Sequence, residues 1–107
     1  MLSTVLALSL LLQEPPPKGP ADWKVEVVAK YPDIKYPSVL CFAPDGRLFI
    51  GEDPMDMEGP ATKPGDRILC MHPDGKVTVF ADGLNAVFGL QYLDGKVYVH
   101  HTPKFSV

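Results

Sequence analysis

Three Asp-Gly turns, each between two runs of strand-forming residues, constrain this chain more than any other feature. They lie at 45–46, 74–75 and 94–95. Asp and Gly tolerate positive backbone φ angles, so this dipeptide between two apolar runs is the strongest local signal for a β-hairpin. The flanking runs are 39–43 with 47–52, 67–72 with 76–80, and 88–93 with 96–101. The sequence therefore predicts three consecutive antiparallel hairpins.

The first and third hairpins also match one another in sequence. Leu40–Ile50 aligns with Leu90–Val99 after deletion of one residue, and Asp45 and Asp94 are 49 positions apart. A period of about 40–50 residues with two hairpins per period is typical of a β-propeller blade, a four-stranded antiparallel sheet. The repeat predicts an all-β, partial β-propeller of about one and a half blades.

The predicted propeller domain spans residues 23–107, with its first blade over 38–81 and the next blade beginning near Ala86. Because a propeller needs at least about four blades to close its ring, we expect the chain to be the truncated N-terminal part of a longer protein. We expect this part to be inactive and poorly soluble by itself, since it leaves sheet edges and faces exposed. A small stand-alone β-sandwich or meander is the competing fold.

The pattern of residues 23–29 predicts one further strand. Trp23, Val25 and Val27 alternate with polar residues at a period of two. In propellers such a first strand often completes the outer edge of the last blade, so we expect it to have no partner within this chain. Twelve prolines and nine glycines argue against long helices.

The N-terminal residues 1–13 resemble a signal peptide. Residues 1–12 carry no charge, and as a helix they would span roughly 18 Å, too short for the ~30 Å hydrocarbon core of a bilayer. This length is typical of the apolar region of a secretory signal; a buried apolar helix is the alternative. Residues 14–22 form a Pro-rich linker. The sequence thus predicts export to the periplasm or cell surface, with no membrane span.

Charge and cysteine content exclude several classes of partner. The net charge is -3, with ten Lys and Arg that form no basic cluster, so nucleic acid is not an expected partner. Cys41 and Cys70 have apolar neighbours and are interpreted as buried thiols, although export would permit a disulfide. The sequence contains no CxxC or CxxCH motif, so neither zinc nor covalent haem is supported within it.

Propeller connectivity sorts the loops into two ends. The three Asp-Gly turns share one end, and the connections 52–66, 83–85 and 100–103 share the other. The second end carries four carboxylates within one loop that are candidate metal ligands or an acid/base group: Glu52, Asp53, Asp56 and Glu58. A solvated acidic loop is the alternative interpretation.

Two adjacent histidines at the same end are candidate catalytic bases. His100 and His101 follow an apolar run, and neighbouring strand residues point to opposite faces, so one metal ion cannot easily use both. One of them could act as a general base, and a structural role is the alternative. His72 precedes a turn at the other end and is interpreted as structural.

Four segments carry a family resemblance. They are Pro37-Ser-Val-Leu-Cys-Phe-Ala-Pro-Asp-Gly-Arg-Leu-Phe-Ile-Gly-Glu52, Asp66-Arg-Ile-Leu-Cys-Met-His-Pro-Asp-Gly-Lys-Val77, Gly83-Leu84 with Phe88-Gly-Leu90, and Asp94-Gly-Lys-Val-Tyr-Val99. Together they resemble the opening blades of glucose/sorbosone dehydrogenase-like β-propellers. Over residues 23–107 the chain is similar to planctomycete-type membrane-bound dehydrogenase proteins, which join a propeller to helical-repeat and c-type haem segments.

The resemblance implies oxidation of a sugar-type alcohol or aldehyde by pyrroloquinoline quinone with calcium, a His acting as general base. Electrons would pass to haem only if a downstream domain exists. Relatives often carry a His where this chain has Asn85. The expected partners are a small-molecule substrate or ligand and the remaining blades of the full-length chain.

Two other functions stay open. One is a non-catalytic NHL-like propeller that binds a ligand or protein, and the other is a metal-dependent lactonase-type propeller that would use the carboxylates at 52–58.

Overall fold

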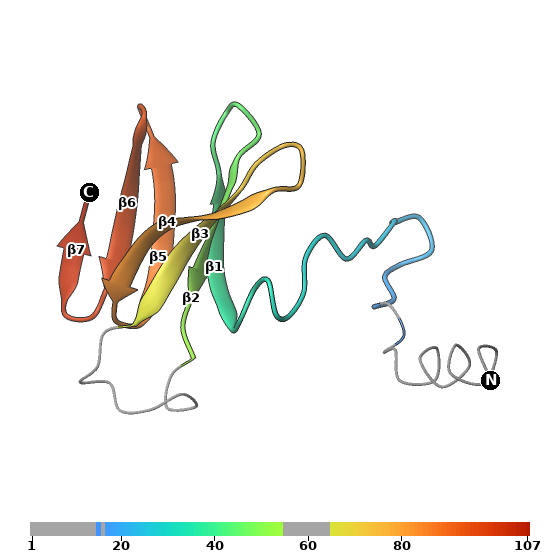
Figure 1. Ribbon diagram of the computed structural model, residues 1–107. Helices are drawn as coiled ribbons and strands as arrows, with labels where there is room; N and C mark the ends of the chain where they lie inside the picture. Colours follow the sequence, from blue (N-terminus) through green and yellow to red (C-terminus); the bar gives the residue numbers. More distant parts are fainter. Residues whose placement is uncertain (1–14, 16, 55–64) are drawn as a thin grey trace.

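The computed structural model describes residue 15 and residues 17–54 and 65–107. The strands in this part of the chain are β1 (Pro37–Phe42), β2 (Leu48–Glu52), β3 (Asp66–Met71), β4 (Val77–Leu84), β5 (Val87–Leu93), β6 (Lys96–His101) and β7 (Lys104–Ser106). They form one antiparallel sheet in the order β1-β2-β3-β4 and a second in the order β5-β6-β7. Figure 1 shows the two sheets, which confirm the all-β expectation.

The first and third hairpins have the same register but lie in different sheets. Leu40 pairs with Ile50 in the first sheet, and Leu90 pairs with Val99 in the second. The first turn has three residues between Ala43 and Arg47, whose N–H and carbonyl groups bond at 2.9 Å. The third turn has only two residues, Asp94 and Gly95, both at positive φ, as a two-residue type I′ turn requires. The difference in turn type accounts for the one-residue deletion.

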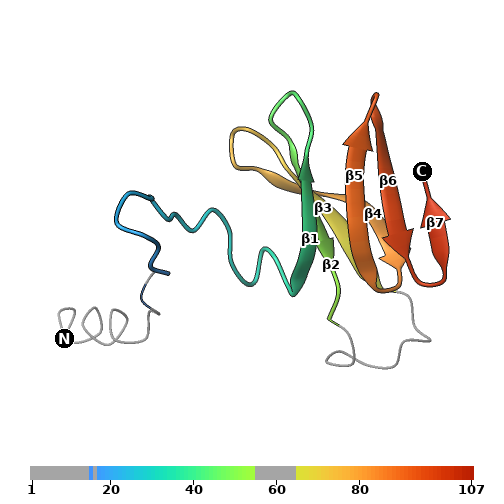
Figure 2. The same cartoon turned by 180° about the vertical axis from the view of Figure 1, so that it is seen from behind.

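The connections between strands lie at two opposite ends of the sheets. In Figures 1 and 2 the three Asp-Gly turns lie together at one end, and the last residues of β2, β4 and β6 lie at the other. The turns are stabilised locally. Asp45 accepts the Arg47 backbone N–H at 3.1 Å, and Asp74 accepts the Lys76 N–H at 2.9 Å. The hydrogen bond from the Arg47 backbone N–H is the main cause that lowers the pKa of Asp45 below its usual 3.8.

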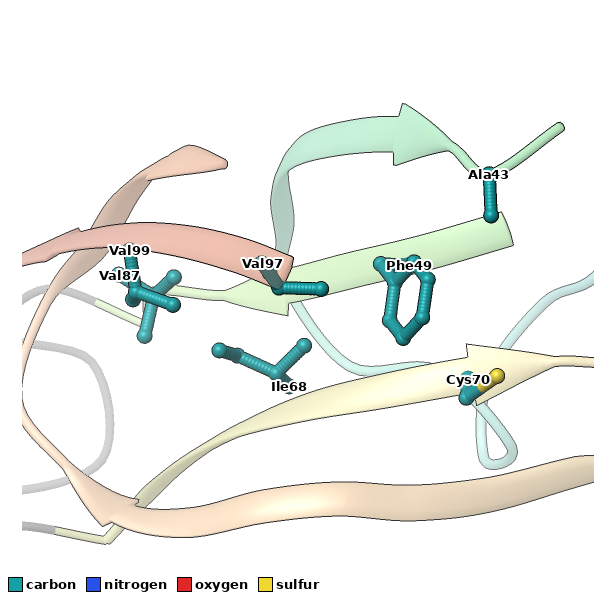
Figure 3. Packing of buried hydrophobic residues seen from close by; sticks show 7 residues of the cluster. All are labelled: Ala43, Phe49, Ile68, Cys70, Val87, Val97 and Val99. Atoms are coloured by element: carbon teal, nitrogen blue, oxygen red, sulfur yellow. The ribbon is translucent and has the colours of Figure 1, made fainter. Parts of the chain in front are cut away.

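The hydrophobic core lies between the two sheets. Figure 3 shows its buried members, Ala43, Phe49, Ile68, Cys70, Val87, Val97 and Val99. The Phe49 ring stacks on the Tyr92 ring with centroids 6.4 Å apart and meets the edge of Phe80 at 5.0 Å. Burial of such a side chain stabilises the fold by about 1.5–3 kcal/mol. The inner face of each sheet is therefore fixed against the other.

The sheets approach most closely where β1 and β2 meet β5. A Cβ added to Gly51 would lie 2.6 Å from Val87 Cγ1 and 2.8 Å from Val39 Cγ2, so only glycine fits there. The Ser38 hydroxyl lies 2.5 Å from the Val87 carbonyl oxygen and 3.1 Å from the Gly51 carbonyl oxygen. It therefore bonds one sheet to the other. Figure 2 shows β1 and β5 side by side at this contact.

The outer face of the first sheet is apolar as well. Ile34, from the segment before β1, packs on Ile50 and Leu69, and partly buried Leu48, Met71 and Val77 surround them. Residues Leu40 and Phe42 of β1 stay 60% and 66% exposed. The first sheet thus carries apolar side chains on both faces, a pattern found where sheets are covered on both sides.

One expectation about strands was wrong, and another is not tested by this chain. Residues 23–29, which were expected to pair only with a strand outside this chain, form no strand here, and Trp23 is 72% exposed. Alternation alone does not make a strand, because the ladder hydrogen bonds need a neighbouring strand. The second sheet also contains a third strand, β7, where the sequence predicted only two. Its Phe105 pairs with His100 in the ladder.

Some predictions fall outside the described residues: the signal-like segment 1–13, and Asp56 and Glu58 of the acidic loop. Among the residues that are described, no helix is long and apolar enough to cross a membrane.

We predict that Gly51→Ala destabilises the chain by about 1–3 kcal/mol, because the added methyl group overpacks the contact with Val87 and Val39. Urea-induced unfolding of the single variant, of Val87→Ala and of the double variant measures the effect. Val87→Ala opens space for the new methyl, so the double variant should lose less stability than the sum of the two singles. Strict additivity would contradict the proposed close contact.

Candidate functional site

A polar cavity lies at the loop-bearing end of the first sheet. Its volume is about 260 Å³, and it is lined by side chains and backbone from before β1, the end of β2 and the start of β3: Lys35, Tyr36, Glu52, Pro54, Gly65, Asp66 and Arg67. Two carboxylates and two cations thus surround one concave space. Ligand sites commonly combine a concave space with a few convergent polar groups.

Glu52 is the buried group of this cavity, with a side chain only 5% exposed. Its Oε2 accepts the Lys35 backbone N–H at 2.7 Å, and its Oε1 accepts the Arg67 Nε–H at 2.6 Å. The β2–β3 register brings the two side chains together, because Gly51 pairs with Ile68 and the next step places Glu52 beside Arg67. The burial of a carboxylate is tolerated only with such partners.

Asp66 joins the cavity to the link between the two sheets. Its Oδ2 accepts the Ala86 N–H at 2.8 Å, and Ala86 has a φ of 52°. Tyr36, on the opposite wall, has a φ of 46°, and its carbonyl accepts the Asp53 N–H at 3.0 Å. Non-glycine residues in the left-handed region are held there only by surrounding structure, and such positions cluster at ligand sites.

The two histidines lie on opposite faces of the second sheet. His101 is 8% exposed, and its Nε2 lies 2.9 Å from the Ser106 Oγ. His100 is exposed and packs against Phe88 with tilted rings, whose centroids are 4.2 Å apart, and its ring is 6.4 Å from that of Phe105. Both belong to β6, whereas the cavity walls described above come from the first sheet and the residues before it.

Glu52 and His101 occupy equivalent positions in the two sheets. Each ends the second strand of its sheet, and the 49-residue offset that relates Asp45 to Asp94 also relates Glu52 to His101. Each is buried, and each bonds a side chain of the third strand, Arg67 in one sheet and Ser106 in the other. Extending the repeat alignment by two residues would have identified this correspondence from sequence.

Of the four candidate metal ligands, Glu52 and Asp53 are neighbours at the end of β2, and Asp56 and Glu58 lie outside the described residues. Glu52 uses both oxygens on protein donors, and the nearby Asp66, which was not predicted as a ligand, uses one. Within the described residues, no three side chains of the His, Cys, Asp and Glu types gather as metal ligands do. Calcium takes about 6–8 oxygen ligands, so Glu52 and Asp66 do not by themselves fit that ion.

Sequence reasoning missed the cations of this cavity. Arg67 follows Asp66 at the start of β3, and its position fifteen residues after Glu52 gave no local signal of a contact. Lys35 contributes its backbone N–H to Glu52, and its Nζ lies 5.9 Å from the centre of the Tyr31 ring.

Cys41, Cys70 and His72 do not line this cavity. Cys41 and Cys70 both pair with Phe49 in the ladder, on either side of it. Two strand spacings separate them by roughly 9–10 Å, too far for a disulfide, and both are free thiols. Desolvation raises the pKa of each thiol above 9.0. His72 bonds Thr78 through Nε2 at 3.0 Å, a structural contact.

The model of the family described as "Domain of unknown function (DUF7133)" matches residues 18–107. No curated protein and no solved structure matches the chain.

We predict that Arg67→Met destabilises the chain by about 1–3 kcal/mol, because it leaves one oxygen of the buried Glu52 carboxylate without its charged donor. The Arg67 side chain is 33% exposed, so solvent limits the loss. The matched control is Arg47→Met, because the Arg47 side chain is equally exposed at 34% but its partner Asp45 is itself 57% exposed. It removes this ion pair and the contact of the guanidinium with the Phe49 ring, 5.4 Å from its centroid, and should cost about 1 kcal/mol or less. Equal losses in thermal unfolding would contradict a structural role of the Glu52–Arg67 pair.

Proposed function

We propose that this chain, which belongs to the DUF7133 family, forms two consecutive sheets of an exported β-propeller of the glucose/sorbosone dehydrogenase-like kind. Its loop-bearing end would bind a small polar ligand, with a sugar-type alcohol or aldehyde as the substrate class. The observation that carries the proposal is the segregation of the molecule into two ends. All three Asp-Gly turns lie at one end, and β2 and β6, whose last residues are the buried Glu52 and His101, finish at the other (Figure 1).

The arrangement of the sheets supports the propeller. The two sheets follow one another in sequence, each starts with a hairpin of the same register, and they pack face to face through an apolar core. Each sheet also presents exposed apolar side chains on its outer face, such as Phe42 and Phe105. Blades of a propeller are covered in this way by neighbours on both sides.

The chemistry of the cavity supports a polyhydroxylated ligand. Lys35, Tyr36, Arg67 and the carboxylate residues Glu52 and Asp66 line it. Charged side chains form stronger hydrogen bonds to hydroxyl groups than neutral ones do, and an aromatic residue in the lining could add a contact to the apolar face of a sugar. Such a site rejects a molecule that lacks one of the expected hydroxyl groups, because a polar group of the protein is then left without a hydrogen-bond partner.

The resemblance adds pyrroloquinoline quinone and calcium to the proposal. The quinone carries carboxylates, for which Lys35 and Arg67 are suitable cations. When bound, such a cofactor supplies the acceptor for a hydride from the substrate. His101 remains the candidate base of this end, held by Ser106. Haem would require a further segment of the protein.

A non-catalytic binding propeller is the second candidate. It is favoured by the fact that Glu52 and His101 both bond side chains of their own sheets. Side chains engaged in this way hold the loops in place. A surface that only binds a ligand needs such fixed loops but needs no catalytic base.

We predict that glucose and pyrroloquinoline quinone, titrated separately, raise the unfolding temperature of the chain, since a ligand that binds only the folded state stabilises it by about 2.7 kcal/mol at one hundred times its Kd. Arg67→Met should reduce the shift, and Arg47→Met, at the turn end, should leave it unchanged. A shift that persists in full in Arg67→Met would place the binding site elsewhere. No shift with either ligand would remove the support for a sugar-type ligand.

Calcium tests the metal part of the proposal separately. We predict that calcium raises the unfolding temperature and that magnesium, which demands a stricter octahedral geometry, does so less. Glu52→Gln, which keeps the size of the side chain and removes its charge, should weaken the calcium effect more than Arg67→Met, which also breaks the Glu52–Arg67 pair but keeps the carboxylate. Unchanged unfolding in calcium would count against a cation site at this end.

A further inference from the structure

The link between the two sheets is only two residues long. Strand β4 ends at Leu84 and β5 begins at Val87, so Asn85 and Ala86 alone join the sheets. Figure 1 shows the start of β3, the end of β4 and the start of β5 together at the loop-bearing end. Ala86 has a φ of 52°, and a non-glycine residue keeps this left-handed conformation only where surrounding groups hold it. The link therefore needs a constraint from outside its own two residues.

Asp66 supplies this constraint from the first sheet. It pairs with Leu84 in the β3–β4 ladder, which places its side chain beside the link. Its Oδ2 accepts the Ala86 N–H at 2.8 Å. Asp66 also lines the polar cavity. The carboxylate that holds the link is thus one that a ligand in the cavity would meet.

The other side of the link is bonded to the end of β6. Val87, the first residue of β5, pairs with His101, the last residue of β6. The Asn85 carbonyl accepts the N–H of Thr102 at 2.8 Å, and Thr102 directly follows His101. Asp66 and His101 therefore lie at ladder positions on either side of the link, and the link is hydrogen-bonded toward both.

The surroundings of His101 within its own sheet do not place it relative to the cavity. Its bond to Ser106 orients the ring, but both residues belong to the second sheet. Two bonds from the first sheet reach this corner of the molecule: Ser38 bonds the Val87 carbonyl, and Asp66 bonds the Ala86 N–H. Of these two residues, only Asp66 lines the cavity.

We propose that Asp66 is a positioning residue, which sets the place of the His101 ring relative to the polar cavity through the bonded link Asn85–Ala86. The inference rests on the proposed function for the role of His101 as a base, and it joins the cavity of the first sheet and His101 of the second into one site. A reacting group must be held in place to be effective. A ligand that engages the Asp66 carboxylate changes its hold on the link, and the two positions are coupled in both directions.

Nuclear magnetic resonance of the three histidine rings tests the positioning without any ligand. We expect Asp66→Ala to shift the ring signals of His101 and to speed amide hydrogen exchange at Thr102 by about ten-fold, since one of the bonds that hold the link is lost. His72, at the turn end, should keep its signals. Asp66→Asn keeps an acceptor oxygen for the Ala86 N–H and should restore both readouts.

Asp74→Ala is the matched control. It removes a carboxylate that also accepts a backbone N–H, that of Lys76 at 2.9 Å, but within a single turn. It should leave the His101 signals and the exchange of Thr102 unchanged. The proposal would be overturned if Asp66→Ala changed these readouts no more than Asp74→Ala does. It would also be overturned if Asp66→Asn behaved like Asp66→Ala, because the bond to Ala86 would then not be the cause.

Glucose separates this proposal from the proposed function. In the unmodified chain, glucose should shift the ring signals of His101, and in Asp66→Ala this shift should be smaller. If the His101 signals respond to Asp66→Ala but not to glucose, the positioning role stands and the sugar-type ligand fails. If they respond to glucose but not to Asp66→Ala, the ligand is supported and the positioning role is overturned.

Discussion

The close approach of Gly51 to Val87 sets the geometry on which the rest of the structure depends. Without a Cβ at position 51, the backbone of β2 lies directly against a side chain of β5. The Ser38 hydroxyl bonds the Val87 carbonyl oxygen at the same place. Protein interiors pack as densely as organic crystals, so the two sheets cannot slide past one another. This contact aligns the second hairpin with the first and brings the same ends of both sheets together.

That alignment places the residues that only stabilise turns at one end of the sheets and the candidate functional residues at the other. The turn end is closed by local hydrogen bonds, in which the carboxylates of Asp45 and Asp74 accept the backbone N–H of the residue two positions ahead. The other end depends on contacts between strands. Glu52 and His101 reach the third strands of their sheets there, and Asp66 reaches the link to the second sheet. Polar groups held by several elements at once are the ones that can present a ligand with a fixed geometry.

The sequence predicted what local chemistry determines. The Asp-Gly turns, the hairpin registers and the opposite orientations of His100 and His101 all follow from period-two alternation and turn type. It did not predict β7, because Lys104–Ser106 is too short to show a period, and it assigned a strand to residues 23–29 that have no neighbour to pair with. For the candidate site, the sequence identified Glu52 and His101, but Glu52 was interpreted as one of four carboxylates in an acidic loop. The partner Arg67 becomes visible only through the β2–β3 register.

The proposed propeller follows from one property of these sheets. A sheet with apolar side chains on one face can be completed by a single partner, as many antiparallel sheets are. The first sheet has Phe49 and Ile68 on one face and Ile50 and Leu69 on the other, so it needs two partners. The two faces also differ, because Phe49 on one face stacks on Tyr92 of the second sheet, whereas Ile34 packs on Ile50 and Leu69 on the other. A pair of unlike faces gives the contact a direction. In a propeller, successive blades of one chain add such a neighbour at each open face.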